Sequence, residues 1–520
     1  MQSLLDQSLR FFSRYRLPTG LYLDKLSTDG STAHTLASTS AAGFGLISLC
    51  ISAERGILSV QDALAQATTT IVAASNISGA SNGFLLHWTD MHGRGSGEYS
   101  TIDTAILCLG AILASKYFSA KEPALTTTHA LALQVRSLTD RVSWSDALLD
   151  DYNGAPGMYL TMSANGNGQG VTRLFNEYYL LAYMGAVAEA SNGNGMNATA
   201  SAFFSTHLNT PPSITMNYWG HQVLSDSTTR FLPSFITIYC YYLSNHYLSS
   251  NAYVSYTASA AYADSLYWQN AAPAANAARG VWGSGAGAYP SAYPSNRNDP
   301  FGYHACAIED NSALVYSAPM MAGFLPVLTA SSSPSKASTI DRLLSWRDEG
   351  DACRYTISST TRMVEESGVD NHTVLWRSSV RYPDWRPPTI EAVDYAPFIL
   401  GLASEVLGIG FFQSHAASLT PPSPPPPPPP HMPTPFSPPP SPPLPPSPPP
   451  PLPEQVVIVS ESDTNILIIM GIGGGLLLLA FACVVVCICW PQSDADKADL
   501  SHQRKDLKQY RKEASRRARG

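Results

Sequence analysis

The sequence predicts an all-α fold, an α/α toroid, over roughly its first 415 residues. Apolar residues recur with helical spacing nearly throughout this region, and no convincing series of alternating strands interrupts it. Long Gly/Ser/Asn/Pro loops, such as 153–170 and 280–303, separate the helices. Polar and aromatic residues gather at one helix end. The inner helices would therefore form the sides of a cleft, and the loops that connect them would form its base.

Start and stop signals place the helices in order along the chain. The first covers 41–53 and stops at Gly56. Ser59 and Asp62 then form a start box for a helix that reaches Ala74. Further helices are predicted at about 100–118, 176–191, 232–248, 254–270, 313–330, 338–347 and 392–407.

The chain is not globular after residue 415. A Pro/Ser-rich linker covers 416–455, and between Pro421 and Pro453 proline makes up 23 of 33 residues, which forces an extended polyproline II rod. Its composition resembles the Ser-Pro-rich rods of green-algal and plant wall glycoproteins. The body, 1–415, is large enough for one big domain.

A transmembrane helix is predicted at 466–490, where 25 residues carry no charge. Gly471 and Gly475 form a small-xxx-small face, which either pairs two helices or reflects the frequency of glycine in single spans. Three cysteines near its end, Cys483, Cys487 and Cys489, are either acylated or simply small apolar residues. The tail, 491–520, has nine Lys/Arg against five Asp/Glu and should face the cytosol.

No secretory signal is visible at the N-terminus, because residues 1–20 have neither an apolar core nor a small-residue cleavage site. Either a signal precedes this sequence, or the transmembrane segment inserts as a late anchor and leaves the body in the cytosol. The rod and the basic tail favour the first alternative. Three sequons, at Asn76, Asn197 and Asn371, are compatible with export. We therefore expect a single-pass protein of the plasma membrane or secretory pathway whose body faces outside.

Charge and cysteine usage exclude some classes of function. The net charge is −8, and without the basic tail it is about −12, which argues against nucleic acid as a partner. Cysteines are scattered through the body, and Cys50, Cys108 and Cys240 lie in apolar helical runs where a buried free thiol is expected. No metal-ligand spacing or cofactor motif appears, so neither a metal nor a cofactor is expected.

A polar, aromatic loop runs directly into the apolar helix predicted from residue 100. Ser100 suits an N-cap, and Asp103 follows three residues later, where a carboxylate pairs with free backbone N–H groups and the helix dipole. Capping and chemistry remain alternatives for Asp103. The loop nevertheless has the residue mix of a carbohydrate cleft: Trp88 and Tyr99 offer flat faces for sugar rings, and Glu98 and Asp103 offer acid, base or hydroxyl-binding groups.

The body resembles the glycoamylase-like domain of bacterial β-1,2-glucanases and cyclic β-1,2-glucan synthases. The resemblance rests on five blocks in family order, STSAAGFGLISLCISAERGILSVQDA (38–63), EYSTIDTAILCLGAILASKYF (98–118), FNEYYLLAYMGAVAEAS (175–191), GVWGSGAGAYP (280–290) and VDYAPFILGLASEVLG (393–408). It implies an (α/α)6 toroid and a glycoside hydrolase, an endo-β-1,2-glucanase acting on β-glucan or oligosaccharides. The predicted transmembrane helix would anchor this hydrolase to a membrane.

The resemblance implies catalytic roles for four carboxylates. In the family an acidic residue after asparagine is associated with proton donation, and here that residue is Glu177; its alternative is a solvated carboxylate in a first helical turn. Glu98 and Asp103 occupy the neighbourhood of a second carboxylate cluster, although some members have aspartate where this chain has Ser100. Asp394 matches an aspartate before the last long helix, as either a cleft residue or a cap.

Glycoside cleavage generally requires one protonated carboxylic acid and one carboxylate. The family resemblance implies inversion in the hydrolases and retention in the transglycosylating relatives, so an inverting hydrolase is expected. The alternatives are a transglycosylase in the same cleft and a non-catalytic glycan-binding wall protein. Residues expected to grip sugar, each with core packing as its alternative, are Trp88, Tyr99, His221, Gln222 and Trp282.

Overall fold

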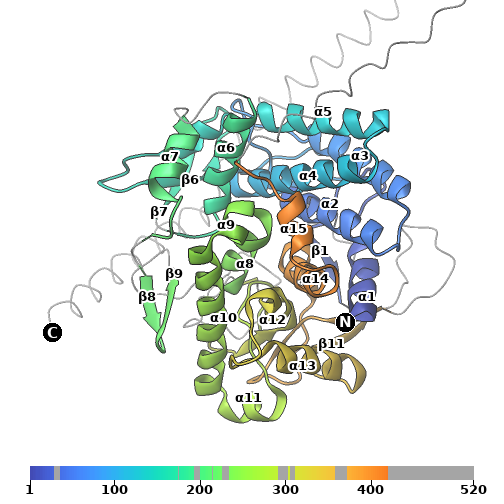
Figure 1. The fold of residues 1–520 in the computed structure, drawn as a ribbon, viewed down its shortest axis with the longest axis vertical. Coiled ribbons are helices and arrows are strands. Elements are labelled where there is room, and N and C mark those ends of the chain that lie inside the picture. Colours follow the sequence, from blue (N-terminus) through green and yellow to red (C-terminus); the bar gives the residue numbers. More distant parts are fainter. Residues whose placement is uncertain are drawn as a thin grey trace, which may run out of the picture. The chain divides into compact units, whose positions relative to one another are not determined.

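Helices of the described chain alternate between inner and outer positions (Figure 1). Inner helices are buried on every side: residues 39–53 of α2 (Thr39–Glu54) and residues 179–188 of α6 (Tyr179–Ser191) are all buried. Outer helices are amphipathic, and α3 (Val60–Ser75) buries one face through residues such as Ala63, Ala67 and Ile71. A helix that is apolar all round is stable only inside a core, whereas an amphipathic one covers it.

Twelve of the described helices give the toroid its two layers. The outer ones are α1 (Gln2–Ser13), α3, α5 (Thr126–Asp140), α7 (Thr199–His207), α10 (Asn251–Ala271) and α13 (Lys336–Asp348). The inner ones are α2, α4 (Thr101–Lys121), α6, α8 (Ser234–Leu243), α12 (Ala318–Gly323) and α14 (Ala392–Leu407). Each inner helix contacts the next, and α14 contacts α2, which closes the ring. The predicted all-α toroid is confirmed.

Shorter helices connect these layers. They are α9 (Asn245–Ser249), α11 (Pro273–Arg279), α15 (Gly410–His415) and two 3-10 turns at Trp144–Ala147 and Leu325–Val327.

The computed structural model describes residues 1–28, 35–173, 175–192, 199–212, 215–224, 233–290, 303–304, 311–357 and 372–419. These belong to a compact unit, Met1–Pro425. The predicted rod, transmembrane helix and tail lie outside the described residues.

Short strands lead into four of the inner helices. Strands β2 (Ala37–Ser38), β4 (Tyr99–Ser100), β10 (Val315–Ser317) and β14 (Thr389–Glu391) directly precede α2, α4, α12 and α14. Their antiparallel partners are β3 (Trp88–Thr89) for β2, β6 (Gly157–Met162) for β4, β13 (Arg377–Ser379) for β10 and β1 (Lys25–Ser27) for β14. The pairs fix where these four helices begin, and the pair of β4 with β6 lies at the start of α4, beside the cavity described below.

One segment predicted as a loop is a hairpin. Residues 153–170 were expected to be irregular, but β6 pairs with β7 (Gly168–Arg173), and β6 also pairs with β4 and β5 (Leu148–Leu149). Gly166, with φ +78°, makes the reversal between the strands without a side-chain clash. Two more hairpins are formed by β8 (Thr215–Tyr218) with β9 (His221–Leu224) and by β11 (Arg354–Ile357) with β12 (His372–Leu375).

Two predicted helices are corrected by the structure. The segment 313–330 contains strand β10, the six-residue helix α12 and a 3-10 turn, with Pro319 and Pro326 in the first turns of the last two. Proline starts a helix readily but cannot continue one through its interior. The segment 232–248 is broken at Ser244, whose hydroxyl accepts a hydrogen bond from the Tyr247 N–H and caps α9.

The predictions of a helix cap at Ser59, a helix stop at Gly56 and buried free cysteines are confirmed. Ser59 caps α3 by accepting a hydrogen bond from the Asp62 N–H at 3.0 Å. Gly56 ends the preceding segment with φ +68°. Cys50, Cys108 and Cys240 are buried free thiols. Among the described helices, α4 alone is long and apolar enough to cross a membrane, but 83% of its apolar stretch is buried inside the toroid, as in a core helix.

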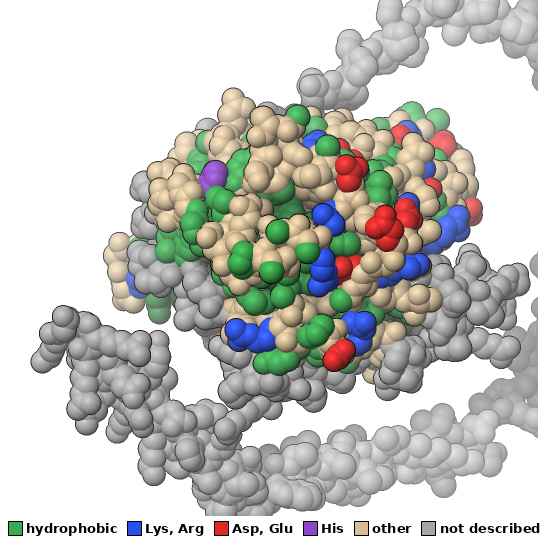
Figure 2. Space-filling model, turned by 90° about the horizontal axis from the view of Figure 1, so that it is seen from below, with side chains coloured by type: hydrophobic (Ala, Val, Ile, Leu, Met, Phe, Trp, Pro, Cys, Tyr) green, Lys and Arg blue, Asp and Glu red, His purple; other side chains and the backbone are tan. Residues whose placement is uncertain are grey.

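On the face seen in Figure 2, acidic and basic side chains are interspersed among polar and apolar ones. The described surface there presents no continuous basic area of the kind that tracks a nucleic-acid backbone.

Candidate active site

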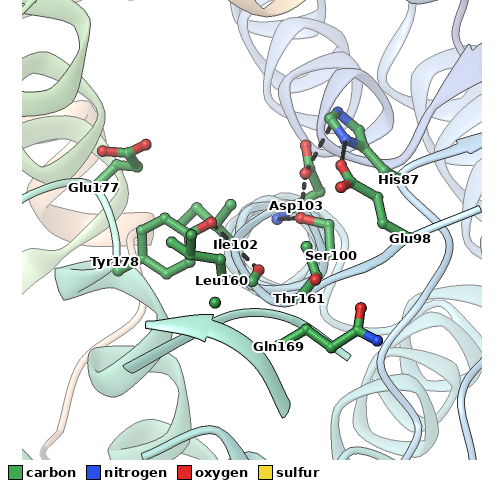
Figure 3. Close-up of a pocket in the computed structure, with 11 residues that line it drawn as sticks. His87, Glu98, Ser100, Ile102, Asp103, Leu160, Thr161, Gln169, Glu177 and Tyr178 are labelled. Atoms are coloured by element: carbon green, nitrogen blue, oxygen red, sulfur yellow. Dashed lines mark hydrogen bonds and ion pairs between the residues drawn. The ribbon is translucent and has the colours of Figure 1, made fainter. Parts of the chain in front are cut away.

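A cavity of about 440 Å³ opens where α4 and α6 begin. In Figure 3, Glu177 lies on one side, Asp103 and His87 lie on the other, and Gln169 lies below them. Its lining combines three carboxylates with a histidine, a tyrosine and neutral polar groups, the composition of a polar ligand site. The lining residues are His87, Glu98, Ser100, Ile102, Asp103, Leu160, Thr161, Gln169, Gly170, Glu177 and Tyr178.

Helix α4 places Asp103 in the cavity wall. Ser100 caps the helix, because its hydroxyl oxygen accepts a hydrogen bond from the Asp103 N–H at 3.2 Å and its hydroxyl donates to Asp103 Oδ2. The Thr101 hydroxyl donates to the Tyr159 and Leu160 carbonyls at 2.8 Å, which fastens the first turn to β6. Asp103 therefore belongs both to the cap and to the cavity lining. The capping role is confirmed, and the chemical role stays a prediction.

A histidine joins two of these carboxylates. His87 Nδ1 lies 2.6 Å from Glu98 Oε1, and its Nε2 lies 3.5 Å from Asp103 Oδ2. Burial lowers the pKa of His87, but the negative charges of Asp103, Glu98 and Asp24 and the hydrogen bond to Glu98 raise it above its ordinary value. The same hydrogen bond lowers the pKa of Glu98 against the effect of burial.

The opposite wall is the turn before α6. The buried Asn176 accepts a hydrogen bond from the Tyr178 N–H at 2.9 Å and donates to the Thr172 hydroxyl of β7. These contacts fix the backbone on both sides of Glu177, whose partly buried side chain lines the cavity. Burial raises the pKa of Tyr178, and the charges of Glu177, Asp103 and Glu98 raise it further, as expected where three carboxylates converge on one pocket.

The floor of the cavity was missed by sequence reasoning. Leu160 and Thr161 come from β6, and Gln169 and Gly170 from β7. The alternation of Met158, Leu160 and Met162 was the available signal for a strand, but the glycines and asparagines around it indicated a loop. Pairing of β6 with β4 carries this hairpin to the start of α4.

Asp394 is buried in the first turn of α14 and is not among the residues that line the cavity. Burial and the charge of Glu391 raise the pKa of Asp394 to about 7, with Arg377 and a hydrogen bond from the Tyr303 hydroxyl opposing. The N-cap residue of α14 is Glu391, so Asp394 is not its cap. The charges of Asp394, Glu177 and Asp103 all raise the pKa of Tyr239 beyond the effect of its burial.

The five residues predicted to bind sugar are more widely separated in the structure than the carboxylates of the cavity. Trp88 is 42% exposed beside the site, where it stacks on His87, and Tyr99 is partly buried on β4 opposite Met162. His221 and Gln222 lie on β9, which contacts α10 rather than the cavity. Trp282 is 2% exposed and stacks on Phe324 in the hydrophobic core. For Trp282 the structure therefore corrects the expected sugar contact to a packing role.

The fold of the body is that of bacterial glucanases and glucoamylase-like proteins. An endo-β-1,2-glucanase from Chitinophaga pinensis, solved with sophorotriose and glucose, matches with TM-score 0.59 and 17% identity over 79% of this chain and 93% of that one. A glucoamylase-like protein from Bacteroides caccae matches with TM-score 0.59 and 15% identity over 79% and 95%. A β-1,2-glucanase from Parabacteroides distasonis matches with TM-score 0.58 and 14% identity over 80% and 58%.

No protein-family model matches the sequence, and no curated protein matches it. At 14–17% identity the structural matches establish the shared toroid. Function has to be argued from the site itself, since one fold hosts many activities.

Proposed function

We propose that this protein is a glycoside hydrolase that cleaves β-glucan, with β-1,2-linked chains as its substrate. The observation that carries the proposal is the pair of carboxylates, Glu177 and Asp103, that face one cavity from opposite walls. Two carboxyl groups flanking a bond are the minimum set for glycoside cleavage. The fold shared with two β-1,2-glucanases supports the choice of linkage.

Glu177 is the proposed proton donor to the leaving glycosidic oxygen. Asp103 is the proposed carboxylate that accepts a proton from water, and water attacks the anomeric carbon from the opposite face, so that the configuration inverts. Glu98 supports Asp103 through His87. Asp394 is buried outside the cavity lining and accepts a hydrogen bond from the Tyr303 hydroxyl, so no contact with substrate is proposed for it.

The decisive assay uses the purified full chain with linear β-1,2-glucan, and with β-1,3-, β-1,4- and α-1,4-glucans as controls. We expect short oligosaccharides from β-1,2-glucan and no products from the controls. Products longer than the substrate would instead identify a transglycosylase. Glucan binding without any product would identify a non-catalytic glycan-binding protein.

We also propose that the body is held outside the cell by the segment 466–490. The basic tail supports this orientation, because an excess of Lys/Arg favours the cytosolic side of a single span. Of the three sequons, Asn76 is exposed at the end of α3, and the other two, Asn197 and Asn371, lie outside the described residues.

Protease added to intact cells that make the protein should therefore remove the body and spare the tail. Antibodies against each end would follow the two fragments, and permeabilised cells would be the control in which both are digested. A body that is protected in intact cells and carries no glycan at any of the three sequons would contradict this topology and exclude an extracellular glucan as substrate.

A further inference from the structure

His87 is held in place by its backbone as well as its ring. Its N–H donates to the Glu98 carbonyl at 3.0 Å, and its carbonyl accepts from the Thr39 N–H at the start of α2. The imidazole stacks on Trp88 with ring centroids 3.5 Å apart and planes at 15°. Trp88 Nε1–H in turn donates to Asp24 Oδ1 at 3.1 Å. The ring is thus fixed from three segments of the chain.

Three acidic groups among the described residues raise the pKa of this ring. Glu98 and Asp103 contact the two ring nitrogens, and Asp24 acts from the segment before β1. Lys25 lies 3.8 Å from Asp24 and offsets part of that charge. Stacking on an indole also favours a cationic ring. The surroundings therefore favour the doubly protonated imidazolium, in which both nitrogens donate.

We propose that His87 is a positioning residue for the hydrolysis proposed above: its imidazolium, fixed between Glu98 and Asp103, orients the Asp103 carboxylate and pairs with its negative charge. The inference rests on the proposed function and assigns the two roles that the cavity alone leaves interchangeable. A carboxylate whose orientation is fixed by these contacts is placed to serve as the base. Glu177, across the cavity, is then the proton donor.

The geometry also distinguishes the two oxygens of Asp103. The contacts from Ser100 and from His87 both engage Oδ2. Within the described residues, Oδ1 is the oxygen left to accept a proton from a water in the cavity. Loss of the imidazolium would release the Asp103 carboxylate from one of these two contacts.

The kinetic test compares His87→Gln with the full-length parent chain. We expect kcat to fall by roughly 10- to 100-fold while KM changes by less than about threefold, since His87 acts through Asp103 and not on substrate. The matched control is His92→Gln, an exposed histidine of the same loop outside the cavity lining, which should behave like the parent.

A second measurement determines the charge of His87 independently of any activity assay. In the full chain labelled at its histidines, NMR titration should find the pKa of His87 above the ordinary histidine value, and lower in Asp103→Asn than in the parent. A His87 pKa at or below the ordinary histidine value, or an active His87→Gln enzyme with unchanged kcat, would overturn the positioning role alone. An inactive parent chain would overturn the proposed function and the positioning role with it, whatever the titration shows.

Discussion

Glu177→Gln is expected to lower kcat by about two to four orders of magnitude, because the amide keeps the shape of the side chain and has no acidic proton to donate. Without protonation of the leaving oxygen, an alkoxide would have to depart. The loss should appear in kcat and kcat/KM alike, since the proton moves only in the transition state. The measurement is steady-state kinetics on β-1,2-glucan, together with a circular dichroism spectrum to verify the fold.

The control for this substitution is Glu122→Gln. Glu122 follows the last residue of α4, at the end remote from the cavity, where it accepts a hydrogen bond from Gln61 at the surface. The same change of charge there should leave kcat within about twofold of the parent. Near-parental activity of Glu177→Gln on β-1,2-glucan would show that another group donates the proton.

The fold was predictable where local signals agree with one another. Helix α14 was predicted at 392–407, its full observed extent, because a long apolar stretch ends in Gly408. The break at Ser244 was not predictable, because Tyr247 and Leu248 of α9 continue the apolar pattern of α8 and a serine inside a helix has little cost. The hairpin of β6 and β7 was missed because its stability comes from pairing with β4, a partner more than fifty residues earlier in the chain.

Two carboxylates of the candidate site were predicted from sequence, whereas most of the residues around them were not. Asp103 and Glu177 were singled out on different helices, and the structure places both in one cavity. The role proposed for His87 could not be predicted from sequence, because its two ring contacts depend on how the loop before β4 folds back on α4. Trp282 has the composition of a sugar platform but packs on Phe324 instead. An aromatic residue in a Gly-rich segment carries no signal that separates these outcomes.

Glycines set how closely the inner helices approach, and Gly401 of α14 is the tightest example. A Cβ at this position would lie 1.9 Å from the Ala322 carbonyl oxygen and 2.3 Å from its carbonyl carbon, on the facing helix α12. Both atoms are backbone, so no side-chain rotation can relieve the overlap. The two helices would have to separate, and the ring would lose packing density where α12 meets α14.

We therefore expect Gly401→Ala to lower the free energy of unfolding by about 3 kcal/mol or more, the upper part of the usual range for overpacking. Thermal unfolding of the full chain, followed by circular dichroism, should show a midpoint several degrees below that of the parent. Gly410→Ala is the control: this position, at the start of α15, has open space around it, and alanine is the better helix former, so its midpoint should be unchanged or slightly higher. Equal midpoints for Gly401→Ala and the parent would mean that α12 and α14 do not close the toroid through this contact.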